Sequence, residues 1–68
     1  MADQKFISKA PIRRLMKSRG ASLVAENAVN KLVSFLEEYA QDITKKAMEI
    51  AQADKRKKIT ENDILDAQ

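Results

Sequence analysis

A long run of apolar residues with helical spacing occupies the middle of the chain. Between residues 25 and 53 there is no Gly or Pro, and apolar positions recur in steps of three and four. Such steps place side chains on one face of an α-helix. The pattern predicts a helix from Ala25 to about Ala53, roughly 40 Å long at 1.5 Å per residue. That length exceeds the width of a globule that so short a chain could form alone, so we expect a second chain to cover the apolar face.

A shorter helix is predicted before this segment. Pro suits the first turn of a helix and Gly the position just past its end, so Pro11 and Gly20 outline a helix over about Pro11 to Arg19. Its apolar residues recur at helical spacing on one face, and they are Ile12, Leu15 and Met16. The helix is therefore expected to be amphipathic, with its basic residues on the flanks and the outer side.

A third helix is predicted from Thr60 to the end of the sequence. The hydroxyl of Thr60 can accept a hydrogen bond from the backbone near Asp63, as in a capping box. Within this helix Ile64 and Ala67 are spaced to face inward, with Leu65 beside them. The predicted layout is short helix, loop, long helix, loop, short helix.

A plain two-stranded coiled coil is the alternative for the middle segment. Six apolar residues fit alternating a and d positions: Val29, Leu32, Leu36, Tyr39, Ile43 and Ile50. Lys46 is the one polar residue that interrupts this series. The apolar set is wider than a two-position seam, however, because it also includes Val33, Phe35, Ala40, Ala47 and Met48. A stripe of that width favours a helix covered from several sides, and we expect Phe35, Tyr39 and the methionines to pack in the core.

The length and composition limit how such a protein can be stabilised. A single domain of 68 residues has a marginal core. The chain has no Cys and no His, so disulfides and the commonest metal ligands are excluded. Association with another chain is the remaining way to stabilise the fold.

The positive charge lies in two segments of the chain. The net charge is only +3, but ten of the thirteen Lys and Arg residues fall in the stretches 5–19 and 55–58, which contain no acid. Nine of the ten Asp and Glu residues lie from Glu26 onward. Two basic segments on a nearly balanced body are typical of a protein that binds a polyanion.

Other classes of protein are excluded or disfavoured. The first residues lack the apolar run of a secretory signal, and no stretch is long and apolar enough to cross a membrane. The neighbouring carboxylates Glu37 and Glu38 would point about 100° apart on a helix, so we interpret both as solvated. Since no His, Cys or glycine-rich phosphate loop is present, we expect a protein without a cofactor, metal or small-molecule substrate that is not an enzyme.

Several motifs resemble those of the archaeal histones and of the histone-fold family generally. They span about residues 10–67 and include the segments 10–14, 20–21, 36–39, 55–59 and 61–65. The most specific is the sequence Lys-Arg-Lys-x-Ile-x-x-x-Asp-Ile-Leu, which follows the long helix. The resemblance implies an all-α histone fold over residues 10–68, after an N-terminal tail of residues 1–9, in a divergent member with a shortened third helix.

The resemblance also implies a handshake homodimer in which two long helices cross. The first loop of each subunit, near Leu23 and Val24, would lie beside the second loop of the other, near Lys58 and Ile59. The dimer core would include Leu32, Leu36, Tyr39, Ile43 and Ile50. The family's ion pair between the second loop and the third helix corresponds to Arg56 and Asp63, a pairing that suits the bidentate guanidinium.

Double-stranded DNA is the partner that the resemblance and the basic segments indicate together. The candidate DNA-binding residues are Lys9, Arg13, Arg14, Lys17, Arg19, Lys55, Lys57 and Lys58. Of these, Arg14 and Lys57 match the family's phosphate or minor-groove contacts. Cations on such a surface neutralise phosphates and release counterions, so binding should be independent of sequence and should weaken steeply with salt. A cytoplasmic, chromosome-associated protein is expected.

The chain departs from the archaeal pattern at two places. Leu23 and Lys58 stand where the family has a groove-inserting Arg and the Thr that holds it. At the usual contact between dimers the chain has Ala53 and Asp66, and like charges would meet there, which disfavours stacking of dimers into long fibres. A homodimer is expected, with a tetramer as a further assembly, and wrapping, bridging and coating of DNA stay open.

Two hypotheses from different classes follow. The first is a homodimer that compacts or bridges DNA. The second is a histone-fold subunit that requires a different histone-fold partner and binds DNA weakly or not at all. The first predicts a stable homodimer in isolation, and the second predicts a chain that aggregates or stays unfolded until its partner is added.

Overall fold

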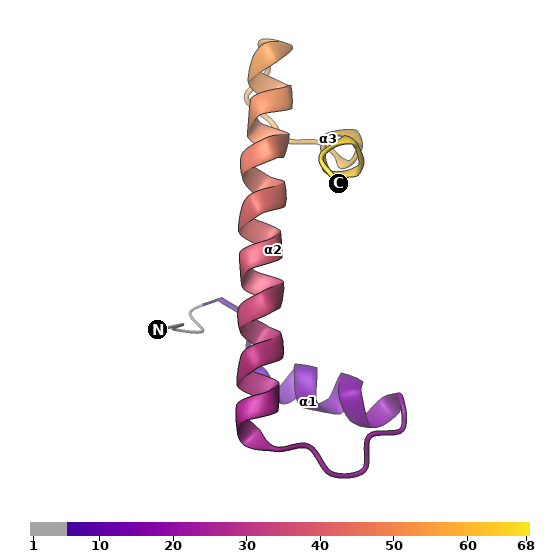
Figure 1. The fold of residues 1–68 in the computed structure, drawn as a ribbon. Coiled ribbons are helices and arrows are strands. Elements are labelled where there is room, and N and C mark those ends of the chain that lie inside the picture. The colour runs from indigo at the N-terminus through magenta and orange to yellow at the C-terminus, as the bar shows by residue number, and fades with distance from the viewer. Residues whose placement is uncertain (1–5) are drawn as a thin grey trace. The chain divides into compact units, whose positions relative to one another are not determined.

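A computed structural model describes residues 6–68, and Lys5 of the first basic segment lies outside these residues. The described chain forms three α-helices joined by two loops: α1 at Lys9–Ser18, α2 at Glu26–Ala53 and α3 at Glu61–Asp66 (Figure 1). Residues 6–68 contain no β-strand. The predicted all-α layout is therefore confirmed, with α1 beginning two residues earlier than Pro11.

The chain divides into two compact units, residues 1–38 and residues 39–68. The first unit holds α1 and the first part of α2, and the second holds the rest of α2 and α3. In the first unit Val29 and Val33, one turn apart on α2, are fully buried. On α1, Ile12 and Met16 are half-buried, whereas Leu15 is exposed, so only part of its predicted apolar face is covered.

A cluster of aliphatic side chains forms the core of the second unit. Ile43 and Ala47 of α2 are buried together with Ala67, which follows α3. The partly buried side chains packed against them are Ile50, Ile59 and Ile64. The inward positions predicted for Ile64 and Ala67 are confirmed, but Leu65 is exposed. Burial of these apolar groups is what fixes α3 to α2.

α1 and α2 end in the same kind of turn. After α1, the backbone N–H of Gly20 donates to the carbonyl of Lys17 (3.0 Å) and that of Ala21 to Met16 (3.2 Å). These two bonds define a Schellman motif, in which the residue just past the helix has a positive φ. The φ of Gly20 is 109°, which a side chain would make costly, so the Gly predicted to end this helix is required by the backbone.

The turn after α2 has the same two bonds without a glycine. The N–H of Lys55 donates to the carbonyl of Gln52 (2.9 Å) and the N–H of Arg56 donates to Ala51 (2.8 Å). Lys55 takes the left-handed conformation, with φ at 59°. That conformation costs an L-residue about 1–2 kcal/mol. The turn that begins the second basic segment is therefore held by the surrounding structure against this preference.

The start of α3 confirms the predicted capping box. The hydroxyl of Thr60 accepts from the backbone N–H of Asp63 (3.4 Å), and the Asp63 carboxylate accepts from the backbone N–H of Thr60 (2.9 Å). These bonds satisfy backbone donors that a helix start leaves unpaired. They fix the point at which the second loop becomes helix.

Glu37 corrects one expectation from the sequence. It was interpreted as solvated, but it is buried at 7% exposure, whereas Glu38 is exposed. One carboxylate oxygen of Glu37 accepts from the backbone N–H groups of Phe6 (2.9 Å) and Ile7 (2.8 Å). The backbone of Phe6 and Ile7 thus lies against α2, and its N–H groups need an acceptor there. Spacing along one helix could not reveal an acceptor for a segment thirty residues away.

Several large apolar side chains of α2 stay exposed in the single chain. Phe35 and Tyr39 are each 57% exposed, Met48 43% and Leu36 37%. The sequence placed Phe35, Tyr39 and the methionines in a core, but the single chain leaves Phe35, Tyr39 and Met48 exposed and buries Met16 only in part. Phe35, Leu36 and Tyr39 lie within about 100° of one another around α2, so they are candidates for contact with another element.

Candidate nucleic-acid interface

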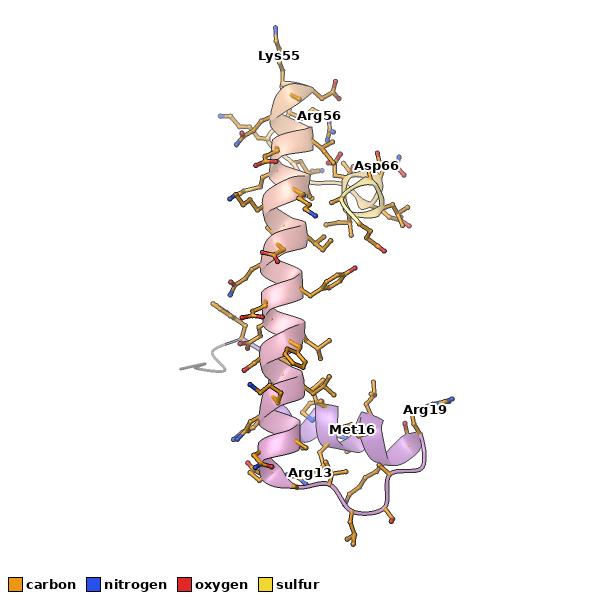
Figure 2. All side chains as sticks on the ribbon, in the orientation of Figure 1. Arg13, Met16, Arg19, Lys55, Arg56 and Asp66 are labelled. Carbon is orange, nitrogen blue, oxygen red and sulfur yellow. The ribbon has the colours of Figure 1, made fainter. Side chains whose placement is uncertain are left out.

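Three cations of the first basic segment lie exposed at α1. Arg14 and Lys17 are on the helix, and Arg19 follows it in the turn that Gly20 closes. Figure 2 shows the Arg19 side chain directed away from the ribbon. None of the three forms an ion pair with another residue between 6 and 68. Their charge is therefore available to an external anion.

Two other candidates at α1 are already paired within the protein. Glu26, the first residue of α2, accepts from the Nζ of Lys9 (3.1 Å) and from the Nη2 of Arg13. The second terminal nitrogen of Arg13 donates to the backbone carbonyl of Val24 (2.8 Å). Arg13 thus joins α1 to the first loop and to the start of α2. This contact makes Arg13 a residue that positions the first loop.

The contacts with Lys9 and Arg13 shift the pKa of Glu26. The hydrogen bond from the Lys9 ammonium lowers the pKa of Glu26 below its ordinary value of 4.5, helped by the charges of Lys9 and Arg13. The Glu26 side chain is 63% exposed, so water and salt screen both pairs. A phosphate group could compete with Glu26 for these two cations.

The second basic segment presents three exposed lysines at the end of α2. Lys55, Lys57 and Lys58 form no ion pair among the described residues. The Lys55 side chain extends from the end of α2, away from the ribbon (Figure 2). The left-handed turn at Lys55 separates these lysines from the regular helix. They form a compact group of positive charge at one loop.

Arg56, within the same run, is held by the protein. Its guanidinium donates to both carboxylate oxygens of Asp63 (2.8 and 3.0 Å), to Asp54 (2.8 Å) and to the backbone carbonyl of Lys58 (3.1 Å). The structure therefore contains the ion pair that the resemblance implies between the second loop and α3. Arg56 fixes the path of the backbone between its neighbouring lysines.

The contact between Arg56 and the buried Asp63 shifts the pKa values of both groups. The Asp63 side chain is only 4% exposed. The hydrogen bond from Arg56, followed by that from the backbone N–H of Thr60, holds the pKa of Asp63 well below its ordinary value of 3.8. The same contact with Asp63, and then that with Asp54, raises the pKa of Arg56. Both groups stay charged at neutral pH, and their charges offset each other.

The candidate residues therefore differ in role. Six cations without an ion pair among residues 6–68 are Arg14, Lys17, Arg19, Lys55, Lys57 and Lys58. Lys9 and Arg13 are in contact with Glu26. The sequence did not identify Glu26 as a partner, because a contact between α1 and the start of α2 depends on how the first loop folds back.

The residues expected in the dimer core have different exposures in the single chain. Ile43 is buried, Leu32 and Ile50 are half-buried, and Leu36 and Tyr39 are exposed. No group of three or more metal-binding side chains occurs in the part of the chain that the structure describes. No helix there is long and apolar enough to span a membrane. The arrangement can neutralise phosphates at two sets of exposed cations.

Comparisons with known proteins identify the family of the fold. A family model described as "Histone-like transcription factor (CBF/NF-Y) and archaeal histone" matches residues 5–67. The chain is also similar to a protein of Thermococcus zilligii that is named as one of the subunits of the archaeal histone HAN1. The two are 44% identical over 55 residues, which cover 81% of this chain and 82% of that protein.

Proposed function

Because this chain belongs to the family of histone-like transcription factors (CBF/NF-Y) and archaeal histones, we propose that it binds double-stranded DNA as a homodimer. It would compact or bridge the DNA without reading its sequence, and it would act on the chromosome. DNA binding and a histone fold follow from the family. The homodimer, the residues in contact with DNA and the effect on DNA are the further steps that we propose.

The observation that carries the proposal is the set of six exposed cations without an ion pair among residues 6–68. Three belong to α1 and its end, and three to the loop after α2. Lysine and arginine side chains that project into solvent bind phosphates, release counterions and do not discriminate between sequences. Binding through these cations would therefore depend on salt far more than on the sequence of the duplex.

The apolar face of α2 supports the homodimer. Leu36 and Tyr39 are exposed in the single chain, although each lies at core spacing with buried or half-buried neighbours such as Ile43. In the proposed handshake, the crossing α2 helices of two copies would cover these side chains, and the first loop of one copy would lie beside the second loop of the other. The dimer would then carry both sets of cations twice.

A mobility-shift series across salt tests DNA binding, with light scattering to establish the mass in solution. We expect a dimer and a shift of mixed-sequence duplexes at ~50 mM salt, weakening steeply as salt rises. Changing Arg14 or Lys57 to Ala should reduce the salt slope by about one unit for each lost contact. Lys45→Ala is the matched control, because it removes an exposed charge outside both sets.

An absent shift at that salt, or slopes for Arg14→Ala and Lys57→Ala equal to that of Lys45→Ala, would remove these residues from a DNA site. Preference for one duplex sequence over another of equal length would contradict phosphate-based binding. Each result bears on DNA binding alone, since the mass is measured separately.

A second candidate function is a histone-fold subunit that requires a different partner. It is favoured by the name of the relative from Thermococcus zilligii, which is called a subunit. In that case the exposed side chains of α2 would be covered by another histone-fold chain. Light scattering distinguishes the two: a folded homodimer in isolation supports the first function, and a monomer or aggregate that becomes ordered with another histone-fold chain supports the second.

A further inference from the structure

A single acid lies among the basic residues of the first unit. Glu26 is the only Asp or Glu between residues 6 and 36, and its carboxylate accepts from both Lys9 (3.1 Å) and Arg13. Lys9 and Arg13 are one helical turn apart on α1, so their side chains lie on the same face. The two cations converge on one carboxylate, and that carboxylate holds them away from an external anion.

The contact has the geometry with which basic side chains bind phosphate. Lys9 donates to one carboxylate oxygen of Glu26, and Arg13 donates to the other. A phosphodiester of DNA also carries one negative charge and presents two oxygens that accept hydrogen bonds, so it can bind between the same two donors. The carboxylate of Glu26 therefore occupies a position that suits a DNA phosphate.

Arg13 does not depend on Glu26 alone for its orientation. Its other terminal nitrogen donates to the backbone carbonyl of Val24 (2.8 Å), and its side chain is 31% exposed. A planar guanidinium that one hydrogen bond already holds keeps its remaining donors aligned, so less entropy is lost when a new acceptor binds. The position between Lys9 and Arg13 is thus preorganised for an incoming anion.

Glu26 can leave this contact at little cost. Its side chain is 63% exposed, and exposed ion pairs contribute little because water and salt screen them. The hydrogen bond from Lys9 keeps the pKa of Glu26 below its ordinary value, so the group is an anion at neutral pH. After release, the carboxylate would still belong to the first turn of α2, where a negative charge is favourable.

We propose that Glu26 is an internal competitor of DNA, and that a phosphate of the duplex replaces its carboxylate between Lys9 and Arg13. The inference rests on the DNA binding of the proposed function and deepens it, because it concerns the same surface at α1. In the free protein the two cations are withheld from solution. In the complex they join the three exposed cations of α1 and its end, and Glu26 limits the affinity.

Lys9→Ala gives the first test, because among residues 6–68 the ammonium of Lys9 donates to Glu26 alone. The variant should reduce the slope of log K against log salt for a mixed-sequence duplex by about one unit for each lost contact. Lys45→Ala, which removes an exposed charge of α2, is the control. Equal slopes for the two variants would mean that Glu26 keeps Lys9 in the complex and would overturn the exchange.

Glu26→Gln should have the opposite effect on DNA binding. Removal of the competing carboxylate should tighten binding by about threefold or more at low salt, because an exposed ion pair no longer has to be broken. Glu38→Gln removes an exposed acid of α2 outside this contact and should change the affinity less. A gain no larger than that of Glu38→Gln would reflect net charge alone and would contradict the proposal.

The double variant separates competition from simple charge repulsion. In a Lys9→Ala background the gain from Glu26→Gln should be smaller than in the wild type, because one of the two withheld cations is missing. Equal gains in both backgrounds would show that Glu26 acts only by repelling DNA, and the proposal would be wrong. Circular dichroism and light scattering establish that each variant is folded and has the mass of the wild type. If Glu26→Gln does not fold, the slope of Lys9→Ala decides alone.

Failure of the exchange can be distinguished from failure of the proposed function. If neither the wild type nor Glu26→Gln shifts a duplex at ~50 mM salt, DNA binding itself is overturned. If the wild type binds and Arg14→Ala reduces the slope, while Lys9→Ala and Glu26→Gln behave like their controls, only the exchange at Glu26 is overturned.

Discussion

After α1 and again after α2, the backbone leaves the helix through a Schellman motif and enters a loop that an arginine holds. In the first loop, Arg13 donates to the carbonyl of Val24 and to the carboxylate of Glu26, the first residue of α2. Each loop is thus fixed by one guanidinium that contacts a loop carbonyl and an acid in the next helix.

The second loop has the same arrangement, but its arginine contacts a more buried acid. Arg56 donates to the carbonyl of Lys58 and to the carboxylate of Asp63 in the first turn of α3. The side chain of Asp63 is 4% exposed, whereas that of Glu26, the acid that Arg13 contacts, is 63% exposed. Asp63 also accepts from the backbone N–H of Thr60.

The difference indicates how each loop should respond to its surroundings. Exposed ion pairs are screened by salt and contribute little to stability, whereas a buried acid that loses its cation leaves an unpaired charge. The second loop should therefore hold its lysines in place under all conditions in which α3 is folded. The first loop depends on a pair that a phosphate or salt can displace.

The largest expected effect comes from removing the two acids in turn. Asp63→Asn should lower the midpoint of urea unfolding several-fold more than Glu26→Gln, because Asp63 is a buried carboxylate that accepts from both the Arg56 guanidinium and the backbone of Thr60, whereas Glu26 is exposed. Both variants are measured at one protein concentration, since a dimer is stabilised by mass action. Asp66→Asn, an exposed acid of the same helix, is the control. Equal losses of stability in the Asp63 and Glu26 variants would contradict the proposed difference between the buried and the exposed acid.

The pH dependence of stability should separate the two acids in the same way. The pKa of Asp63 is lowered in the folded state, so its stabilisation is present above its ordinary pKa of 3.8 and is lost as pH falls through the folded value. Stability should decline below about pH 4, and Asp63→Asn should flatten that decline. Glu26→Gln should flatten it less. If stability still declines below about pH 4 in the Asp63→Asn variant, other carboxylates cause the decline.

The starts of the two helices after the loops also differ. α3 begins at Thr60 with a capping box, whereas the residue before α2 is Ala25, whose side chain has no oxygen. Thr60→Ala should lower the free energy of unfolding by about 1 kcal/mol, and Ala25→Ser should raise it by a similar amount. Thermal unfolding of both variants tests whether the first loses stability and the second gains it. A gain from Ala25→Ser as small as experimental error would show that backbone contacts already satisfy that helix start.

Effects no larger than those at the helix starts are expected at the residues that turn the chain after each helix. Gly20→Ala should cost about 1 kcal/mol through its positive φ alone, since an added Cβ meets no atom within 4 Å. At the equivalent position of the second loop, Lys55→Gly should be about 1 kcal/mol more stable than Lys55→Ala. The alanine variant controls for the lost charge. If the two Lys55 variants are equally stable, the left-handed turn is not strained.

The fold followed from the sequence where the signal was local. The spacing of apolar residues predicted α2, Pro11 and Gly20 outlined α1, and Thr60 with Asp63 predicted the start of α3. Each of these depends on residues within a few positions of one another. The turn at Lys55 escaped prediction because a Schellman motif usually shows itself by a Gly, and here the backbone is forced into it by the flanking contacts.

The parts that could not be predicted depend on contacts between distant segments. The burial of Glu37 arises from Phe6 and Ile7, and the pairing of Arg13 with Glu26 arises from the path of the first loop. Charge clustering identified the basic residues, but it could not tell a free cation from one already bound by an acid. That distinction comes only from the folded structure, and it separates the candidates for DNA contact from the residues that position them.

Whether the exposed cations at the two loops bind DNA can be decided by the salt dependence of DNA affinity in three double variants of equal charge. Two remove candidate contacts, as Arg14→Ala with Lys17→Ala and as Lys57→Ala with Lys58→Ala, and the third changes Lys31 and Lys45 of α2 to Ala. We expect the first two to reduce the slope of log K against log salt by about two units or more, and the third to leave it nearly unchanged. Equal reductions in all three would show that binding depends on net charge and not on these two loops.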